Sequence, residues 1–276
     1  MQEIDVEDAV GTDNCARCGG LGWVVVDDGQ AGAAEPCTCR TKVLLAESLA
    51  AAGVPGRHRR CSFDSFDPSG HASLLEAKTL AQRYVERFVR RDGSFTDTGL
   101  LFWGPPGTGK THLAVAILQD LVKRYRVRAH FADFASLIHS IQATFGNDSG
   151  SNRGDVLSPA LNAELLVLDE IGAQKPRAWT LEQLDLLINT RYNARLPTIF
   201  TSNYALPSSN QEGRAESSES LDREPSPQND QGQTTLASRI PQRLLSRLFE
   251  MVRPIQMWSE DYRREVAGQK AANSLK

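Results

Sequence analysis

The chain has 276 residues, long enough for one large domain or two smaller ones, and its 40% apolar and 24% charged residues are ordinary for a globular protein. A net charge of -3 excludes a globally basic nucleic-acid-binding surface, so any such site must be a local basic patch. No apolar run is long enough to span a bilayer, and the first residues are acidic rather than signal-like. We therefore expect a cytoplasmic protein without a membrane partner, whose five cysteines are reduced or metal-bound.

The amino-terminal segment carries four cysteines in two close pairs. The pairs flank a short stretch of β-forming residues with a turn-like sequence at 27–29, which predicts a hairpin between them. Thiol pairs on tight turns beside a hairpin are typical of a tetrahedral zinc site, and so small a segment has little apolar area for a core without a metal. We predict a zinc ion bound by Cys15, Cys18, Cys37 and Cys39.

The alternative for this segment is four unligated thiols in a loop-rich region, because the second pair has C-x-C rather than C-x-x-C spacing. The fifth cysteine, Cys61, is predicted to be a small buried residue. His58 would replace a ligand only if Cys39 does not bind.

A linker helix follows the cysteine segment. Apolar residues at helical spacing predict a helix over 41–52, which Gly53 and Pro55 end. The basic run at 57–60 is either solvated or in contact with phosphate, and residues 74–88 have the spacing of an amphipathic helix. The predicted organisation is a zinc module with its linker helix over 1–55, a nucleotide-binding domain over 56–265 and a polar tail over 266–276.

Residues 104–111 match the phosphate-binding loop pattern G-x-x-x-x-G-K-[ST] in full. An apolar run at 100–103 predicts a buried strand before the loop, and apolar residues over 113–121 predict a helix after it. Glycines let backbone N–H groups turn toward phosphates, and the helix start adds its dipole. We predict nucleoside triphosphate binding, with the lysine on the outer phosphates and the last threonine on Mg²⁺, by Gly104, Pro105, Pro106, Gly107, Thr108, Gly109, Lys110 and Thr111.

A second acidic motif follows two further predicted elements, a strand at 127–132 and a helix at 134–145, and a flexible break at 147–152. A continuous apolar run at 165–168 ends in Asp169 and Glu170, as expected of a buried parallel strand that delivers acids at its carboxyl edge. Asp169 is predicted to hold Mg²⁺, and Glu170 to orient and deprotonate the attacking water. The alternative is a plain acidic turn, which the complete phosphate loop makes the weaker interpretation.

The remaining elements are a helix at 179–192, a strand at 198–203, a disordered insertion at 208–235, a helix at 236–249 and a fifth strand at 252–258. Asn203, at the strand tip, is either a residue that positions the same water or a turn-stabilising asparagine. Arg243 and Arg247 lie four apart on one helix face. They are either a solvated pair, or Arg247 protrudes into the nucleotide site of a neighbouring subunit.

These motifs resemble those of the AAA+ ATPases of the DnaC/DnaI/IstB group. The resemblance covers residues 60–265 apart from the insertion. Its specificity comes from the combination of four motifs: the phosphate loop, Asp-Glu-Ile-Gly at 169–172, Arg-Tyr at 191–192 and Thr-Ser-Asn-Tyr at 201–204. It implies a three-layer α/β fold with a mostly parallel five-stranded sheet, preceded by the small zinc module. It also implies that Asn203 is the sensor residue, Arg247 the arginine finger and Arg263 a nucleotide-sensing arginine.

The resemblance implies an ATP- and Mg²⁺-dependent loader of the replicative DNA helicase, which binds the helicase through its zinc module and self-associates through the finger. Single-stranded DNA would be gripped by residues 133–160, where Arg153 and Phe145 are the main candidates, or near the cations of 123–128. Two rival functions are an IstB-like transposition helper ATPase and an adaptor whose zinc module does the work while ATP switches it.

Overall fold

The computed structural model describes residues 15–26, 33–68, 70–144, 153–174, 177–207 and 235–259. Its centre is a sheet of five parallel strands in the order β4-β5-β6-β3-β7. The strands are β3 (Gly99–Trp103), β4 (Ala129–Asp133), β5 (Leu165–Asp169), β6 (Thr198–Ser202) and β7 (Val252–Gln256). The predicted α/β class and five-stranded parallel sheet are confirmed.

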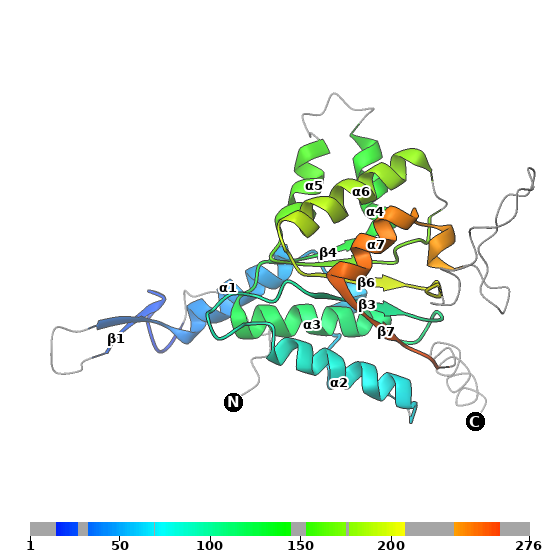
Figure 1. The fold of residues 1–276 in the computed structure, drawn as a ribbon. Coiled ribbons are helices and arrows are strands. Elements are labelled where there is room, and N and C mark those ends of the chain that lie inside the picture. Colours follow the sequence, from blue (N-terminus) through cyan, green and yellow to red (C-terminus); the bar gives the residue numbers. More distant parts are fainter. Residues whose placement is uncertain are drawn as a thin grey trace, which may run out of the picture.

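Helices cover both faces of this sheet, which explains why its central strands are continuous apolar runs. One face packs against α1 (Thr38–Ala51), α2 (Ala72–Glu86) and α3 (Lys110–Tyr125). The other packs against α4 (Phe134–Ala143), α5 (Arg153–Asn162), α6 (Ala178–Asn193) and α7 (Gln242–Met251). Figure 1 shows these two helical layers on either side of the strands, and they make the three-layer architecture that the sequence predicts.

Alternate residues of each strand supply the two cores. In β5, Leu165 and Val167 point into the core with α3, whereas Leu166 and Leu168 point into the core with α6. This period of two follows from the pleat of the strand. It leaves Asp169, the last strand residue, at the carboxyl edge of the sheet.

The amino-terminal segment forms the predicted hairpin. Strands β1 (Trp23–Val26) and β2 (Ala33–Pro36) pair antiparallel, and α1 begins directly after Cys37. Leu45 of α1 is buried in the core against α3, so this helix runs from the hairpin into the nucleotide-binding domain, as Figure 1 shows. The domain boundary proposed near residue 55 comes after α1. The second half of α1 already packs against the larger domain, so the two parts of the chain are in contact before that boundary.

Several predicted boundaries are corrected by the structure. The single helix predicted over 236–249 is instead a 3₁₀ turn at Leu236–Ser238 followed by α7, because Pro241 cannot continue a helix from the residue before it. Helix α5 was not predicted from periodicity, since Gly154 and Pro159 lower its helical signal. The predicted break at 147–152, the tail at 266–276 and the insertion at 208–235, apart from its last residue, lie outside the described residues.

That last residue, Thr235, is buried and forms a bridge with Ala205. The two ends of the insertion therefore meet beside the carboxyl end of β6. No helix in the described part of the chain combines the length and apolar character needed to cross a bilayer.

Arg191 of α6 is completely buried and holds the opposite edge of the sheet together. Its guanidinium donates to Thr198 Oγ1 at 2.8 Å and to the carbonyls of Ala160, Ala163 and Pro197 at 2.8 to 3.0 Å. It therefore satisfies carbonyls at the end of α5, which no backbone donor of that helix reaches. Burial lowers the pKa of Arg191 to about 10, so it stays charged at neutral pH.

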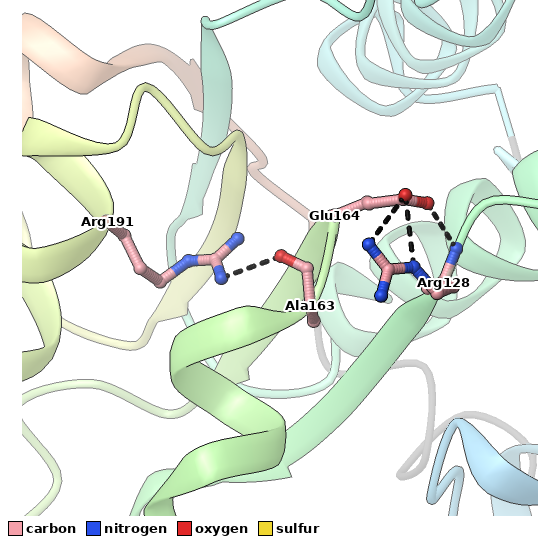
Figure 2. A network of polar contacts seen from close by, with 4 residues as sticks. All are labelled: Arg128, Ala163, Glu164 and Arg191. Carbon is pink, nitrogen blue, oxygen red and sulfur yellow. Dashed lines mark hydrogen bonds and ion pairs between the residues drawn. The ribbon is translucent and has the colours of Figure 1, made fainter.

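Next to Arg191, the exposed Arg128 pairs with Glu164 across the starts of β4 and β5 (Figure 2). The Arg128 guanidinium donates to Glu164 Oε1 at 2.9 and 3.1 Å, and its backbone N–H donates to Oε2 at 2.8 Å. The two arginines thus differ in burial while sharing one corner of the fold.

We predict that Arg191→Met lowers the free energy of unfolding by about 3–5 kcal/mol, because several buried carbonyls lose their donor. Arg128→Ala, the matched control, should cost about 1 kcal/mol or less, since it breaks an exposed pair. Urea denaturation of the two variants measures the difference. Equal unfolding midpoints for Arg191→Met and the wild-type chain would contradict the structural role of Arg191.

Candidate active site

The phosphate-binding loop joins the end of β3 to the start of α3 and is fixed by its neighbours. The Gly104 N–H donates to the Ser202 carbonyl of β6 at 3.2 Å. A Cβ added at Gly104 would lie 2.0 Å from the Met257 carbonyl oxygen, so only glycine fits there. Gly109 has a φ of +86° and starts α3, which points the first N–H groups of that helix into the loop.

The Lys110 side chain lies inside the phosphate-binding loop. Its ammonium donates to the carbonyls of Gly104 at 2.8 Å and Pro105 at 2.6 Å, and the residue is only 6% exposed. The buried ammonium and the helix start form a cationic cradle of the kind that binds phosphate. The structure thus places the predicted residues 104–111 in one loop that closes around the Lys110 ammonium.

Asp169 is held on two sides by threonine hydroxyls. Thr111, in the first turn of α3, donates to its two carboxylate oxygens at 2.9 and 3.2 Å, and Thr201 of β6 donates at 2.6 Å. Asp169 is 2% exposed, and burial raises its pKa while these two hydrogen bonds oppose the rise. A carboxylate beside a hydroxyl at the phosphate cradle is an oxygen donor set that fits Mg²⁺.

Glu170 follows Asp169 with a backbone φ of +58°, a left-handed conformation that costs a residue other than glycine about 1–3 kcal/mol. Its backbone N–H donates to Thr201 Oγ1 at 2.9 Å, which fixes this conformation. Desolvation first, and then the charges of Asp169 and Asp133, raise the pKa of the Glu170 carboxyl. Strain at an acid of raised pKa beside a phosphate cradle is typical of a catalytic base.

Sequence reasoning missed one residue of this site. Thr201 was treated only as part of a polar strand end, yet its hydroxyl binds both Asp169 and the Glu170 backbone. The basic run at 57–60 was predicted to be either solvated or in contact with phosphate, and the charge of Arg57 opposes the rise in the pKa of Asp169 and Glu170.

Asn203 is exposed and directly follows β6, the strand between β5 and β3. The structure therefore places it at the same sheet edge as Asp169 and the phosphate loop. The role of Asn203 in positioning water stays a prediction.

The arginines of the late helix contact α6 of their own chain. Arg247 donates to Asn189 Oδ1, and Arg243 forms an ion pair with Asp185 at 3.7 Å. A third arginine, Arg239, lies over the Tyr204 ring at 4.8 Å, and its buried Nε has no hydrogen-bond partner among the described residues. Arg263 lies outside the described residues, so its predicted role stays untested.

The four amino-terminal cysteines form one cluster whose sulfur atoms all lie within 4.8 Å of one another. Cys15 and Cys37 are 3.8 Å apart, Cys18 and Cys39 are 3.5 Å apart, and the Gly22 N–H donates to the Cys18 sulfur at 3.2 Å. Backbone N–H groups lower the pKa of Cys15, which favours its thiolate, whereas burial and the neighbouring thiols raise the pKa of Cys39. Four thiols at this spacing fit a tetrahedral zinc ion.

The other two candidate ligands lie elsewhere. Cys61 is buried, as predicted, and its sulfur is 3.8 Å from His58 Nδ1. Both residues belong to the segment between α1 and α2, and neither is in the four-cysteine cluster. The geometry therefore favours Cys39 over His58 as the fourth ligand.

The cations considered for DNA binding lie at the far end of α3, about 24 Å from the phosphate loop for a helix of 16 residues. Two of them are paired: Arg124 with Asp120 at 2.9 Å and Arg128 with Glu164. Phe145 and the side chain of Arg153 lie outside the described residues. A single-stranded DNA site on this chain therefore stays a proposal.

Comparison with known proteins is consistent with the phosphate loop and the acidic motif described above. The family described as IstB-like ATP binding protein matches residues 35–213. The replicative helicase loader DnaC of Escherichia coli (strain K12) is 32% identical over 146 residues, which cover 53% of this chain and 56% of DnaC. The chain thus spans about half the length of the curated relatives it matches.

Solved structures extend the likeness to the fold. The crystal structure of the DnaC helicase loader has a TM-score of 0.56 and 28% identity, and the match covers 74% of this chain and all of that one. The crystal structure of DnaI, at 20% identity, has a TM-score of 0.54 over 74% of this chain and 95% of that one, which supports the fold alone. This chain therefore belongs to the family of IstB-like ATP binding proteins, within the DnaC/DnaI/IstB group of AAA+ proteins.

Proposed function

We propose that this protein hydrolyses ATP and uses the cycle to load the replicative DNA helicase. The observation that carries the ATPase proposal is Asp169, which hydrogen-bonds at once to Thr111 at the phosphate loop and to Thr201 beside the strained Glu170. A protein that only bound nucleotide would need the loop but not a strained acid next to it. The helicase proposal is supported by the similarity to DnaC and by the cysteine module.

For hydrolysis, each residue has a distinct task. The loop amides and Lys110 would bind the phosphates, while Thr111 and Asp169 would hold Mg²⁺, which supplies charge neutralisation when bound. Glu170 would orient a water molecule and accept its proton, a task that its raised pKa favours. Asn203 would help to place that water, and Arg263 would contact the nucleotide.

For loading, the helicase would bind the cysteine module with zinc in place, and single-stranded DNA would bind the face formed by α4 and α5. A cytoplasmic location follows from this function. The alternative is a transposition helper ATPase, which the name of the matching family favours. The cysteine cluster distinguishes the two, because we do not expect a transposase helper to need a separate helicase-binding module.

An assay of helicase loading onto DNA tests the proposed function. The full chain, the replicative helicase and a circular single-stranded DNA are mixed with or without ATP, and helicase retained on the circle is measured. ATP-dependent retention that requires this chain supports the loader. No capture of helicase, together with intact ATP turnover, would reject the loader and leave the ATPase.

We predict that Glu170→Gln keeps ATP binding but lowers turnover by about 10²–10⁴-fold, because the amide cannot accept the proton from water. Binding of a fluorescent ATP analogue and phosphate release measure the two properties separately. Lys110→Ala, the comparison variant, should lose binding. Unchanged turnover in Glu170→Gln would assign the base to another residue.

We predict about one zinc per chain in protein purified without chelator. Cys15→Ser and Cys37→Ser should each lose the metal and the capture of helicase, since serine is a poor zinc ligand. Cys61→Ser is the matched control and should keep both, because Cys61 lies outside the cluster. Metal analysis and a helicase pull-down with each full-length variant test this, and a metal-free wild-type chain would contradict it.

We predict that Arg247 acts on the nucleotide of a neighbouring subunit. Arg247→Ala should then lower turnover by up to about 10³-fold, and mixing it with Glu170→Gln should restore part of the activity, since mixed assemblies contain intact composite sites. Arg243→Ala, one helical turn earlier, is the control. If mixing with Arg239→Ala restores activity and mixing with Arg247→Ala does not, the finger is Arg239.

A further inference from the structure

Three polar pairs join α6 and α7 along their solvent side. The pairs are Arg243 with Asp185 at 3.7 Å, Arg247 with the Oδ1 atom of Asn189, and the Tyr192 hydroxyl with Glu250 Oε2 at 2.7 Å. Successive pairs are spaced by four and then three residues on both helices, so they lie on successive turns of one face. They form a polar ladder between the two helices.

The middle pair of the ladder differs from its neighbours in charge. In the first and last pairs the acceptor is a carboxylate, whereas Arg247 donates to the neutral amide of Asn189. The carboxylate of Asp185 offsets the charge of Arg243. An amide oxygen accepts a hydrogen bond and leaves the charge of the guanidinium uncompensated. Of the two arginines on this face, Arg247 is therefore the one whose positive charge remains available.

The ladder also keeps a nearby carboxylate away from Arg247. Glu250, the only acidic residue in the sequence of α7, lies three residues after Arg247, a spacing at which helical side chains form ion pairs. Within the described parts of the chain, Glu250 accepts from Tyr192 and forms no ion pair with Arg247. The hydrogen bond with Glu250 raises the pKa of Tyr192, and the charge of Arg247 opposes this rise.

The place of Arg247 in the fold separates it from its own phosphate loop. Helix α7 belongs to the layer that contains α4, α5 and α6, whereas α3, which starts from the loop, lies in the layer on the other face of the sheet (Figure 1). The Arg247 side chain is exposed and directed toward α6 by its contact with Asn189. A nucleotide therefore meets this guanidinium when another chain brings its own site to the α6–α7 surface.

We propose that Asn189 is a positioning residue, which holds the Arg247 guanidinium in place and fully charged for the nucleotide of a neighbouring subunit. Only the amide oxygen accepts from the guanidinium, so the contact fixes the direction of the arginine side chain. It occupies one N–H group and leaves the others for phosphate oxygens. The proposal rests on the proposed ATP hydrolysis and on the action of Arg247 in trans, and it adds a residue that acts only through Arg247.

The test exchanges the acceptors of the ladder in full-length variants and measures steady-state ATP hydrolysis. Asn189→Asp adds a carboxylate that neutralises Arg247, so kcat should fall about tenfold while KM for ATP is unchanged. Asn189→Ala keeps the charge but loses the acceptor, and kcat should fall about fivefold. Asp185→Asn, the matched control, makes the opposite exchange one turn earlier and should keep wild-type turnover. All three variants should melt within about 2 °C of the wild-type chain, because exposed pairs contribute little to stability.

Mixing two variants separates action in trans from a local defect. Glu170→Gln lacks the proposed base but carries an intact Arg247, whereas Asn189→Asp has the base and a neutralised Arg247. An equimolar mixture should hydrolyse ATP about fivefold faster than the mean of its two components, because the Glu170→Gln subunit supplies a charged arginine to the intact site of its neighbour. A mixture that only matches this mean overturns positioning in trans.

The remaining outcomes distinguish this proposal from those on which it rests. Wild-type turnover in both Asn189 variants, together with an impaired Arg247→Ala variant, rejects the role of Asn189 alone. Unchanged turnover in Arg247→Ala rejects the arginine finger and this proposal with it. A wild-type chain that does not hydrolyse ATP rejects the proposed ATPase itself, and the role of Asn189 falls with it.

Discussion

The site depends on a single buried carboxylate that two threonine hydroxyls hold. Asp169 would be costly to bury alone, and Thr111 and Thr201 satisfy it from two different elements, the first turn of α3 and the strand β6. This arrangement fixes the distance between the phosphate loop and the acidic motif before any nucleotide binds. Thr201 also holds the strained backbone of Glu170, so one hydroxyl orders both acids.

The sheet makes this convergence possible. Strand β6 lies between β5 and β3, so the carboxyl ends of β5, which carries Asp169, of β6, and of β3, which leads into the phosphate loop, are adjacent at one edge of the sheet. At the opposite edge, Arg191 of α6 binds the end of α5 and the starts of β5 and β6, and the pair Arg128–Glu164 joins the starts of β4 and β5. The structural cations thus lie at one end of the sheet, and the proposed catalytic groups lie at the other.

The cysteine module is joined to this core through packing as well as through the chain. Leu45 of α1 is buried against α3, and the segment after α1 pairs with β4 and then follows α3 toward Thr111. Ordered elements therefore connect the module to the carboxyl edge of the sheet.

Much of the site followed from local sequence, because a phosphate loop and an acid-terminated apolar strand are continuous in the chain. Residues 104–111 and the pair Asp169 and Glu170 were identified in this way, as were the four clustered cysteines. The 3₁₀ turn before α7 and the existence of α5 were not, since proline and glycine weaken helical periodicity there. The sequence by itself determined the phosphate loop, the two acids and the positions along the chain of the five strands of the sheet. Only the tertiary structure decided that Thr201 orders both acids and that Arg191 is buried, because these contacts join residues far apart in the chain and depend on how the elements pack.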